Sequence, residues 1–191
     1  MAGCEVTQNA VSVRKWALPA YEWVSALIVS LLVLVVLFTF FFRVVRVDGA
    51  SMDDTLQHND QLLLTTVVSE YQRGDIVVVD RYTIEPLVKR VIAIGGDTIK
   101  IDKKGYVYLN GTLLSEPYAA QYTPQKDCVE TVVVPEGYVF LMGDNRLVSL
   151  DSRSSEIGLV LEKDLVGKAI FRISPLSSFG GIYSNMEQNV H

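Results

Sequence analysis

The sequence LVKRVIAI occupies residues 87–94 and is followed directly by Gly95-Gly96-Asp97. Its β-branched and other apolar residues predict a strand that ends at the two glycines. Side chains alternate between the two faces of a strand, so Lys89 lies on one face and Arg90 on the other, and both faces are otherwise mainly apolar. Two interpretations remain open. The cations protect an exposed sheet edge from aggregation, or one of them is buried for a chemical purpose.

Short apolar runs separated by turn residues lie on both sides of this strand. We expect further strands at residues 62–68, 76–79, 98–102, 106–109, 112–114, 131–134, 138–142 and 165–174. The pair Asn110-Gly111 predicts a type I′ hairpin turn, because these residues tolerate the positive φ angles that the turn requires. Residues 115–130 are expected to form a loop. The pattern predicts a mainly β protein, an antiparallel barrel or sandwich.

An uncharged and mostly apolar run of 20 residues occupies positions 23–42. As a helix rising about 1.5 Å per residue it would span roughly 30 Å, the thickness of the hydrocarbon core of a bilayer. A secretory signal has a shorter apolar core of about 7–15 residues. We therefore predict one transmembrane helix at residues 20–42. A cytoplasmic N-terminal segment, residues 1–19, would precede it, and a β domain at residues 43–174 and a tail at residues 175–191 would follow.

The charges do not decide how this helix is oriented in the membrane. Arg14 and Lys15 precede the run and Arg43 and Arg46 follow it, so the positive-inside rule gives a tie. The net charge of −5 gives no sign of a nucleic-acid partner.

The cysteines and histidines are too few for a metal site. Cys4 and Cys128 lie on opposite sides of the apolar run and could not form a disulfide within one chain that spans a membrane. His58 and His191 are too few for a histidine-based metal site. We expect no metal and no cofactor.

Ser51 lies in the stretch GASMDDTL, residues 49–56, shortly after the apolar run. A serine in such a place is ordinarily a turn residue. Burial can, however, lower the pKa of a lysine by several units, and the neutral amine can then act as a general base. Lys89 could activate Ser51 in this way, with an amine in the place that histidine takes in other serine hydrolases. The two residues are 38 positions apart, so only the fold could join them.

A third stretch, MGDNRLVSLDSR at residues 142–153, gathers carboxylates, guanidinium groups and hydroxyls in one short loop. By itself it would be a turn with surface ion pairs. Other segments precede it in a fixed order: Ser51-Met52 with Thr55-Leu56, Gly74-Asp75-Ile76-Val77, and Lys89-Arg90-Val91-Ile92 with Gly95-Gly96-Asp97. This ordered set resembles the bacterial type I signal peptidases, membrane-bound serine proteases of the Ser-Lys clan.

The resemblance implies a signal-peptidase-like β domain on the extracytoplasmic side of the cell membrane. This domain would cleave signal peptides from exported preproteins at Ala-x-Ala-like sites, so the implied partners are signal peptides and the lipid bilayer. Ser51 would be the nucleophile and Lys89 the general base, and Ser149 would hydrogen-bond the Lys89 amine. Met52 would line the substrate pocket, or else pack in the core. A supporting ion-pair network would hold the loop against the Lys89 strand through Asp144, Arg146, Asp151 and Arg153. The oligomeric state is not indicated.

Two positions depart from the family pattern. Asp54 stands where the family usually has proline, and Gly49 stands where some members have a hydroxyl that helps to bind the oxyanion. Three rival interpretations are a membrane-anchored β domain that binds exported proteins without cutting them, a self-cleaving repressor, and a eukaryotic-type signal peptidase with a histidine base. The presence of both Ser51 and Lys89 disfavours the first. The apolar run occupies the place of the repressor's DNA-binding domain, and His58 lies outside the matching segments.

Overall fold

The computed structural model describes residues 6–53, 55–80, 86–119, 122–128 and 130–182. The chain divides into a helical unit that ends at Phe41 and a β unit that begins at Phe42. The helical unit is α1, Val6–Phe41, and its segment Tyr21–Phe41 is long and apolar enough to cross a membrane. The helix begins earlier in the chain than predicted and ends one residue earlier. Asp54, one of the two departures from the family pattern, lies outside the described residues.

The larger sheet of the β unit is antiparallel throughout and has the order β1-β2-β11-β3-β4-β9-β10, with β12 pairing β11. Its strands are β1 (Phe42–Arg46), β2 (Gln61–Thr65), β3 (Ile76–Val79), β4 (Leu87–Ile94), β9 (Tyr138–Met142), β10 (Val160–Leu161), β11 (Leu165–Ser174) and β12 (Gly180–Gly181). Two 3-10 turns flank β11, at Glu162–Asp164 and Leu176–Ser178.

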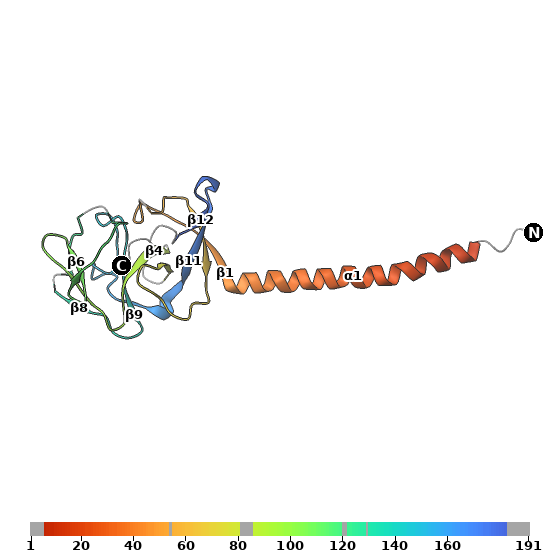
Figure 1. Cartoon of the computed structure of the whole chain (residues 1–191), viewed down its shortest axis with the longest axis horizontal. Coiled ribbons are helices and arrows are strands. Elements are labelled where there is room, and N and C mark those ends of the chain that lie inside the picture. The colour runs from red at the N-terminus through yellow and green to blue at the C-terminus, as the bar shows by residue number, and fades with distance from the viewer. Residues whose placement is uncertain (1–5, 54, 81–85, 120–121, 129, 183–191) are drawn as a thin grey trace, which may run out of the picture. The chain divides into compact units, whose positions relative to one another are not determined.

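The smaller sheet has the order β7-β6-β5-β8 and lies on the side of the β unit away from β1 and β12 (Figure 1). Its strands are β5 (Thr98–Ile101), β6 (Val107–Leu109), β7 (Thr112–Leu113) and β8 (Val132–Val133). Asn110 and Gly111 have φ angles of 51° and 81° between β6 and β7, so the predicted hairpin turn is confirmed. The predicted fold class is confirmed as well: mainly antiparallel β with one N-terminal apolar helix.

Strand β4 lies inside the larger sheet, between β3 and β9. Val88 to Ala93 are all buried, because partner strands cover both edges and packed side chains cover both faces. The interpretation of residues 87–94 as an exposed edge strand is therefore wrong. Lys89 and Arg90 are both buried in the interior.

Three clusters of apolar side chains form the core of the β unit. One packs the turn after Ser51 against β2, β3 and β4 through Met52, Leu56, Leu64 and Val88. A second joins the smaller sheet to β4 and β9, and a third lies among β3, β9 and β11. The turn that carries Ser51 is thus packed against β4, the strand that carries Lys89, and against β2 and β3.

The structure differs from the predicted elements at both ends of the β unit. Residues 42–46 form β1, a strand that was not predicted, and it pairs with β2. Gly180–Gly181 pairs with β11, so the folded unit extends past residue 174 into the expected tail. Residues 183–191 of that tail lie outside the described residues. The described part of residues 115–130 contains turns and irregular backbone, as predicted for a loop.

Candidate active site

The fold brings Ser51 and Lys89 into contact. Lys89 Nζ lies 2.8 Å from Ser51 Oγ and 2.9 Å from the carbonyl oxygen of Val88, to which it donates a hydrogen bond. Lys89 is only 2% exposed, whereas Ser51 is half-buried. The hydrogen bond to Val88 O fixes the rotation of the amine, so a second position on the nitrogen faces the serine hydroxyl.

Burial lowers the pKa of the Lys89 amine from 10.5 to about 8. The carboxylates of Asp151 and Asp144 oppose this change, because they favour the charged amine, and the positive charge of Lys126 reinforces it. At pH 7 an amine with a pKa near 8 is neutral in roughly one molecule in ten. A neutral amine at 2.8 Å from a hydroxyl oxygen can accept its proton, so this pair can generate a serine nucleophile.

The backbone of Ser51 is fixed by the loop that follows β9. Its carbonyl oxygen accepts a hydrogen bond from the N–H of Asn145 at 3.1 Å. Gly143 makes this approach possible, because a Cβ at position 143 would collide with the Ser51 carbonyl oxygen and with the side chain of Ser149. The N–H of Leu56 closes the turn after Ser51 on the carbonyl of Met52 at 2.8 Å.

The residues just before Ser51 leave its own N–H available. Gly49 has a φ of 85°, and its N–H donates to Nδ1 of His58 at 3.2 Å. The N–H of Ser51 donates to no group in the part of the chain that the structure describes. His58 also lies 3.2 Å from Asp48, so the contacts of this histidine are with the residues before Ser51 and not with its hydroxyl. The rival prediction of a histidine base therefore has no geometric support.

Arg90, the neighbour of Lys89 on β4, holds the loop after β9 against this strand. Its guanidinium group forms a bidentate ion pair with Asp144, with Nε 2.8 Å from Oδ1, and both side chains are fully buried. Asp144 also accepts a hydrogen bond from Thr55 Oγ1, four residues after Ser51. One buried carboxylate thus links the strand of the candidate base to the turn of the candidate nucleophile.

The other charged residues of the loop form a second group of buried ion pairs. Asp151 pairs with Arg153 through Nε and Nη2 of the guanidinium group, each at 2.8 Å, and accepts the N–H of Gly143 at 3.1 Å. Burial alone would raise the pKa of Asp151, but the hydrogen bonds and charge of Arg153 outweigh burial and lower it. Arg146 pairs with Glu116, in a bidentate contact, and not with a carboxylate of its own loop. The network therefore reaches into residues 115–130.

Ser149 lies in this cluster without the expected hydrogen bond to Lys89. Its hydroxyl is fully buried and has no hydrogen-bond partner among the described residues. The Lys89 amine makes its hydrogen bonds to Ser51 and Val88 instead. The hydroxyl nevertheless lies near enough to Asp151 to help lower the pKa of that carboxyl.

Met52 is fully buried and packs in the core cluster with Leu56 and Leu64. Its side chain exposes no surface to a substrate in this structure, which favours core packing over the predicted place in a substrate pocket.

Several residues of the site were not predicted from the sequence. Arg90 and Thr55 belong to the matched segments but were given no role. The signal for Arg90 was its position on the face of a mainly apolar strand opposite Lys89. Glu116 and Lys126 gave no such signal, because they lie in an irregular segment and reach the loop only through the fold.

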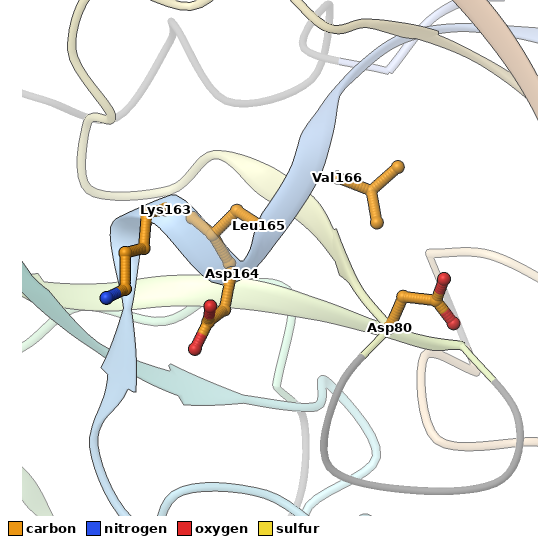
Figure 2. Close-up of a pocket in the computed structure, with 5 residues that line it drawn as sticks. All are labelled: Asp80, Lys163, Asp164, Leu165 and Val166. Atoms are coloured by element: carbon orange, nitrogen blue, oxygen red, sulfur yellow. The ribbon is translucent and has the colours of Figure 1, made fainter.

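A pocket of about 420 Å³ lies apart from Ser51 and Lys89, where β3 and β11 meet. Figure 2 shows its lining residues: Asp80, Lys163, Asp164, Leu165 and Val166. None of them belongs to the Ser51 and Lys89 cluster. Among the described residues no group of histidines, cysteines and carboxylates could hold a metal ion.

The chain is similar to a known family over most of its length. A family model described as signal peptidase, peptidase S26, matches residues 20–174. A signal peptidase I from Bacillus licheniformis is 36% identical over 169 residues, which cover 82% of this chain and 90% of that protein. Signal peptidase I T from Bacillus subtilis (strain 168) is 33% identical over 82% of this chain and 86% of that protein. The crystal structure of a signal peptidase I from Enterococcus faecalis is 30% identical and covers 53% of this chain and 98% of that chain, with a TM-score of 0.46.

Proposed function

Because this chain belongs to the signal peptidase family, peptidase S26, we propose that Ser51 and Lys89 are the catalytic pair with which it works. The chain is a serine peptidase that cleaves signal peptides from preproteins. The observation that supports the assignment of the pair is the contact of 2.8 Å between the buried Lys89 amine and the hydroxyl of the half-buried Ser51.

The first half of the reaction forms an acyl-enzyme. Ser51 Oγ attacks the carbonyl carbon of the scissile peptide bond while its proton passes to the neutral Lys89 amine. The tetrahedral intermediate collapses by breaking the C–N bond, and the ammonium group of Lys89 gives its proton to the leaving nitrogen. The mature protein departs with a free amino group, and the signal peptide remains as an ester on Ser51.

The second half restores the enzyme. Water attacks the ester carbonyl while Lys89, neutral again, takes a proton from it. Collapse of the second intermediate breaks the bond to Ser51 Oγ, which recovers its proton from Lys89. The signal peptide leaves with a free carboxylate, and no other reactant is consumed.

The oxyanion of each intermediate needs hydrogen-bond donors. We assign the N–H of Ser51 to this role, because it lies on the nucleophile and donates to no other described group. Gly49 offers no side-chain donor. Losing one oxyanion donor costs about 3 kcal/mol in other hydrolases, so a second donor from the backbone or from water is part of the proposal.

The supporting residues act by fixing these groups. Asp144 joins β4 to the nucleophile turn, and Asp151 with Arg153 holds the N–H of Gly143, which lies against Ser51. Arg146 ties the loop to Glu116, and Ser149 fills the buried space beside Gly143 without adding a charge. Met52 supports the turn that carries Ser51 through its place in the core.

The proposal includes the substrate and the location. The helix Tyr21–Phe41 and the family relationship make this a membrane-anchored protein. We assign it a single pass with the β unit on the extracytoplasmic side, where signal peptides of exported preproteins arrive in the bilayer. Ala-x-Ala-like cleavage sites are the substrates we assign. Protease protection of the β unit in sealed cells tests the sidedness.

The decisive experiment incubates a signal-bearing precursor with the full chain in detergent. Ser51→Ala and Lys89→Ala should each abolish cleavage, with folding checked by thermal unfolding. Exposed residues on the same unit supply matched controls, Ser178→Ala and Lys100→Ala, which should cleave as the wild type does. Full activity of either site variant would refute the mechanism. Stable association of the wild type with an uncut precursor would favour the rival function of a binding module.

A further inference from the structure

The turn at residues 124–128 is built against the loop of the site. The N–H of Cys128 closes it on the carbonyl of Gln125 at 3.0 Å. Two contacts to Arg153 hold it in place: the N–H of Asp127 donates to the Arg153 carbonyl at 3.1 Å, and a guanidinium nitrogen of Arg153 donates to the carbonyl of Pro124 at 3.1 Å. The turn is therefore attached to the ion pairs that surround Ser51 and Lys89.

Lys126 lies at the centre of this turn and has a φ of 52°. Residues with a β carbon rarely adopt this left-handed conformation, and glycine or asparagine is the usual choice. The surroundings of Lys126 hold it in this conformation, at a turn that contacts the candidate active site. Such strained positions are often functional, so the contacts of its side chain are of interest.

The side chain of Lys126 reaches from the surface into the site. Its ammonium group donates a hydrogen bond to the carbonyl oxygen of Ser149, a fully buried residue of the loop. Ser149 packs against Gly143, and Gly143 lies against the carbonyl of Ser51. Lys126 thus contacts the backbone that holds the candidate nucleophile, from the side of residues 115–130.

The charges around Lys89 give the Lys126 ammonium a second effect. The carboxylates of Asp151 and Asp144 act on Lys89 in the direction that keeps it protonated, and Lys126 is the cation that acts against them. The charge of Lys126 also acts on Asp127, its exposed neighbour in the turn. A protonated Lys89 cannot accept the proton of Ser51, so a nearby cation favours the reactive form of the base.

We infer that Lys126 is a positioning residue of the site, which holds the Ser149 backbone in place and adds positive charge beside the base. The inference rests on the proposed function, because it assumes that Lys89 acts as a neutral amine. It assigns a role to a residue outside the matched sequence segments.

The test compares pH profiles of kcat/KM for precursor cleavage by the full chain. Lys126→Gly removes the ammonium group and suits the left-handed backbone, so it is expected to fold. Its ascending limb should move to higher pH, and a move of half a pH unit would appear as about a threefold loss of activity below the limb. Lys126→Arg keeps the charge and should keep the wild-type limb. Lys100→Gln, which removes an exposed charge on β5, is the control and should leave the profile unchanged.

The outcomes separate this inference from the proposed function. A Lys126→Gly profile with the wild-type limb would overturn the inference, whatever the maximal rate, and so would an arginine variant that shifts as far as the glycine variant. Activity of Lys89→Ala would instead refute the proposed function. A second measurement does not depend on cleavage. In the Ser51→Ala background, an amine-reactive acylating reagent modifies Lys89 at a rate that rises with pH. Adding Lys126→Gly should move this rise to higher pH.

Discussion

Replacing Lys89 with methionine should abolish cleavage and yet stabilise the fold at neutral pH. Methionine has a similar length and no charge, so it fits the same buried site without the need to desolvate an ammonium group. Lys89 is 2% exposed, so little solvent screening reduces this effect.

The magnitude follows from the pKa of the amine in the two states. Burial lowers the pKa of Lys89 from 10.5 to about 8 on folding, and each pH unit of difference corresponds to about 1.4 kcal/mol. At pH 7 the lowered pKa therefore reduces the free energy of unfolding of the wild type by roughly 3 kcal/mol. Losing the hydrogen bonds to Ser51 and Val88 costs about 1 kcal/mol each, so the net gain of the variant is about 1 kcal/mol.

The sign of the pH dependence is fixed by the direction of the change in pKa. Between pH 8 and 10.5 the unfolded chain binds the Lys89 proton and the folded chain does not, so the wild type gains stability as the pH rises. The penalty is complete below pH 8 and is lost as the pH approaches 10.5. The stability advantage of Lys89→Met should therefore shrink by about 3 kcal/mol over this interval and reverse.

The assay is thermal or urea unfolding of the full chain in detergent for both proteins, at intervals from pH 7 to 10.5. Groups that titrate in both proteins cancel in the difference. At pH 7 the melting temperature of Lys89→Met should exceed that of the wild type by about 2–4 °C for a unit of this size. A difference in stability that stays constant across the pH range would refute the claim that burial lowers the pKa of this amine.

Three further predictions concern other residues of the β unit. Asp144→Asn leaves the Arg90 charge buried without a carboxylate, and urea unfolding should show a loss of about 3–5 kcal/mol, whereas a loss below 1 would contradict the buried ion pair. Burial alone would raise the pKa of Asp97, but ionic and neutral hydrogen bonds hold it at about 2, so its contribution of about 1–2 kcal/mol is present above pH 4 and lost as the pH falls through 2. Unfolding curves of Asp97→Asn and the wild type should accordingly converge at low pH. Gly143→Ala should reduce kcat at least about tenfold through the backbone of the nucleophile, while Gly180→Ala, which meets no atom within 4 Å, should be neutral in the cleavage assay.

The local patterns of the sequence predicted most of the strands. Residues 76–79, 87–94, 138–142 and 165–174 are strands with the predicted bounds. Turn chemistry was equally informative at Asn110-Gly111, where both positive φ angles were expected. Such elements depend on a few neighbouring residues, which is why the sequence indicates them.

The environment of an element was harder to predict than its type. The sequence of residues 87–94 left an edge strand and a buried strand both open, because burial depends on β3 and β9, which come from other parts of the chain. The C-terminal end of α1 was also hard to predict, because the apolar composition continues through Phe42 into β1. Composition alone does not mark where a helix gives way to a strand.

The site showed the same division. Ser51 and Lys89 were predicted from their residue types and matched segments, and the fold places them in contact. The partners of the charged loop were not, because Arg146 and Glu116 lie 30 positions apart in the chain and a single sequence carries no signal for that pairing. The same reason applies to Lys126, which reaches Ser149 across 23 positions.

The adjacency of Lys89 and Arg90 on β4 links the register of this strand to catalysis. A slip of one residue against β3 and β9 would exchange the faces of the two side chains. A guanidinium group, which stays protonated at any physiological pH, would then occupy the place of the base, and the shorter amine would face Asp144. Under the proposed mechanism, a chain that misaligns this strand during folding would be both poorly packed and unable to cut, so packing and activity depend on the same alignment of the central strand.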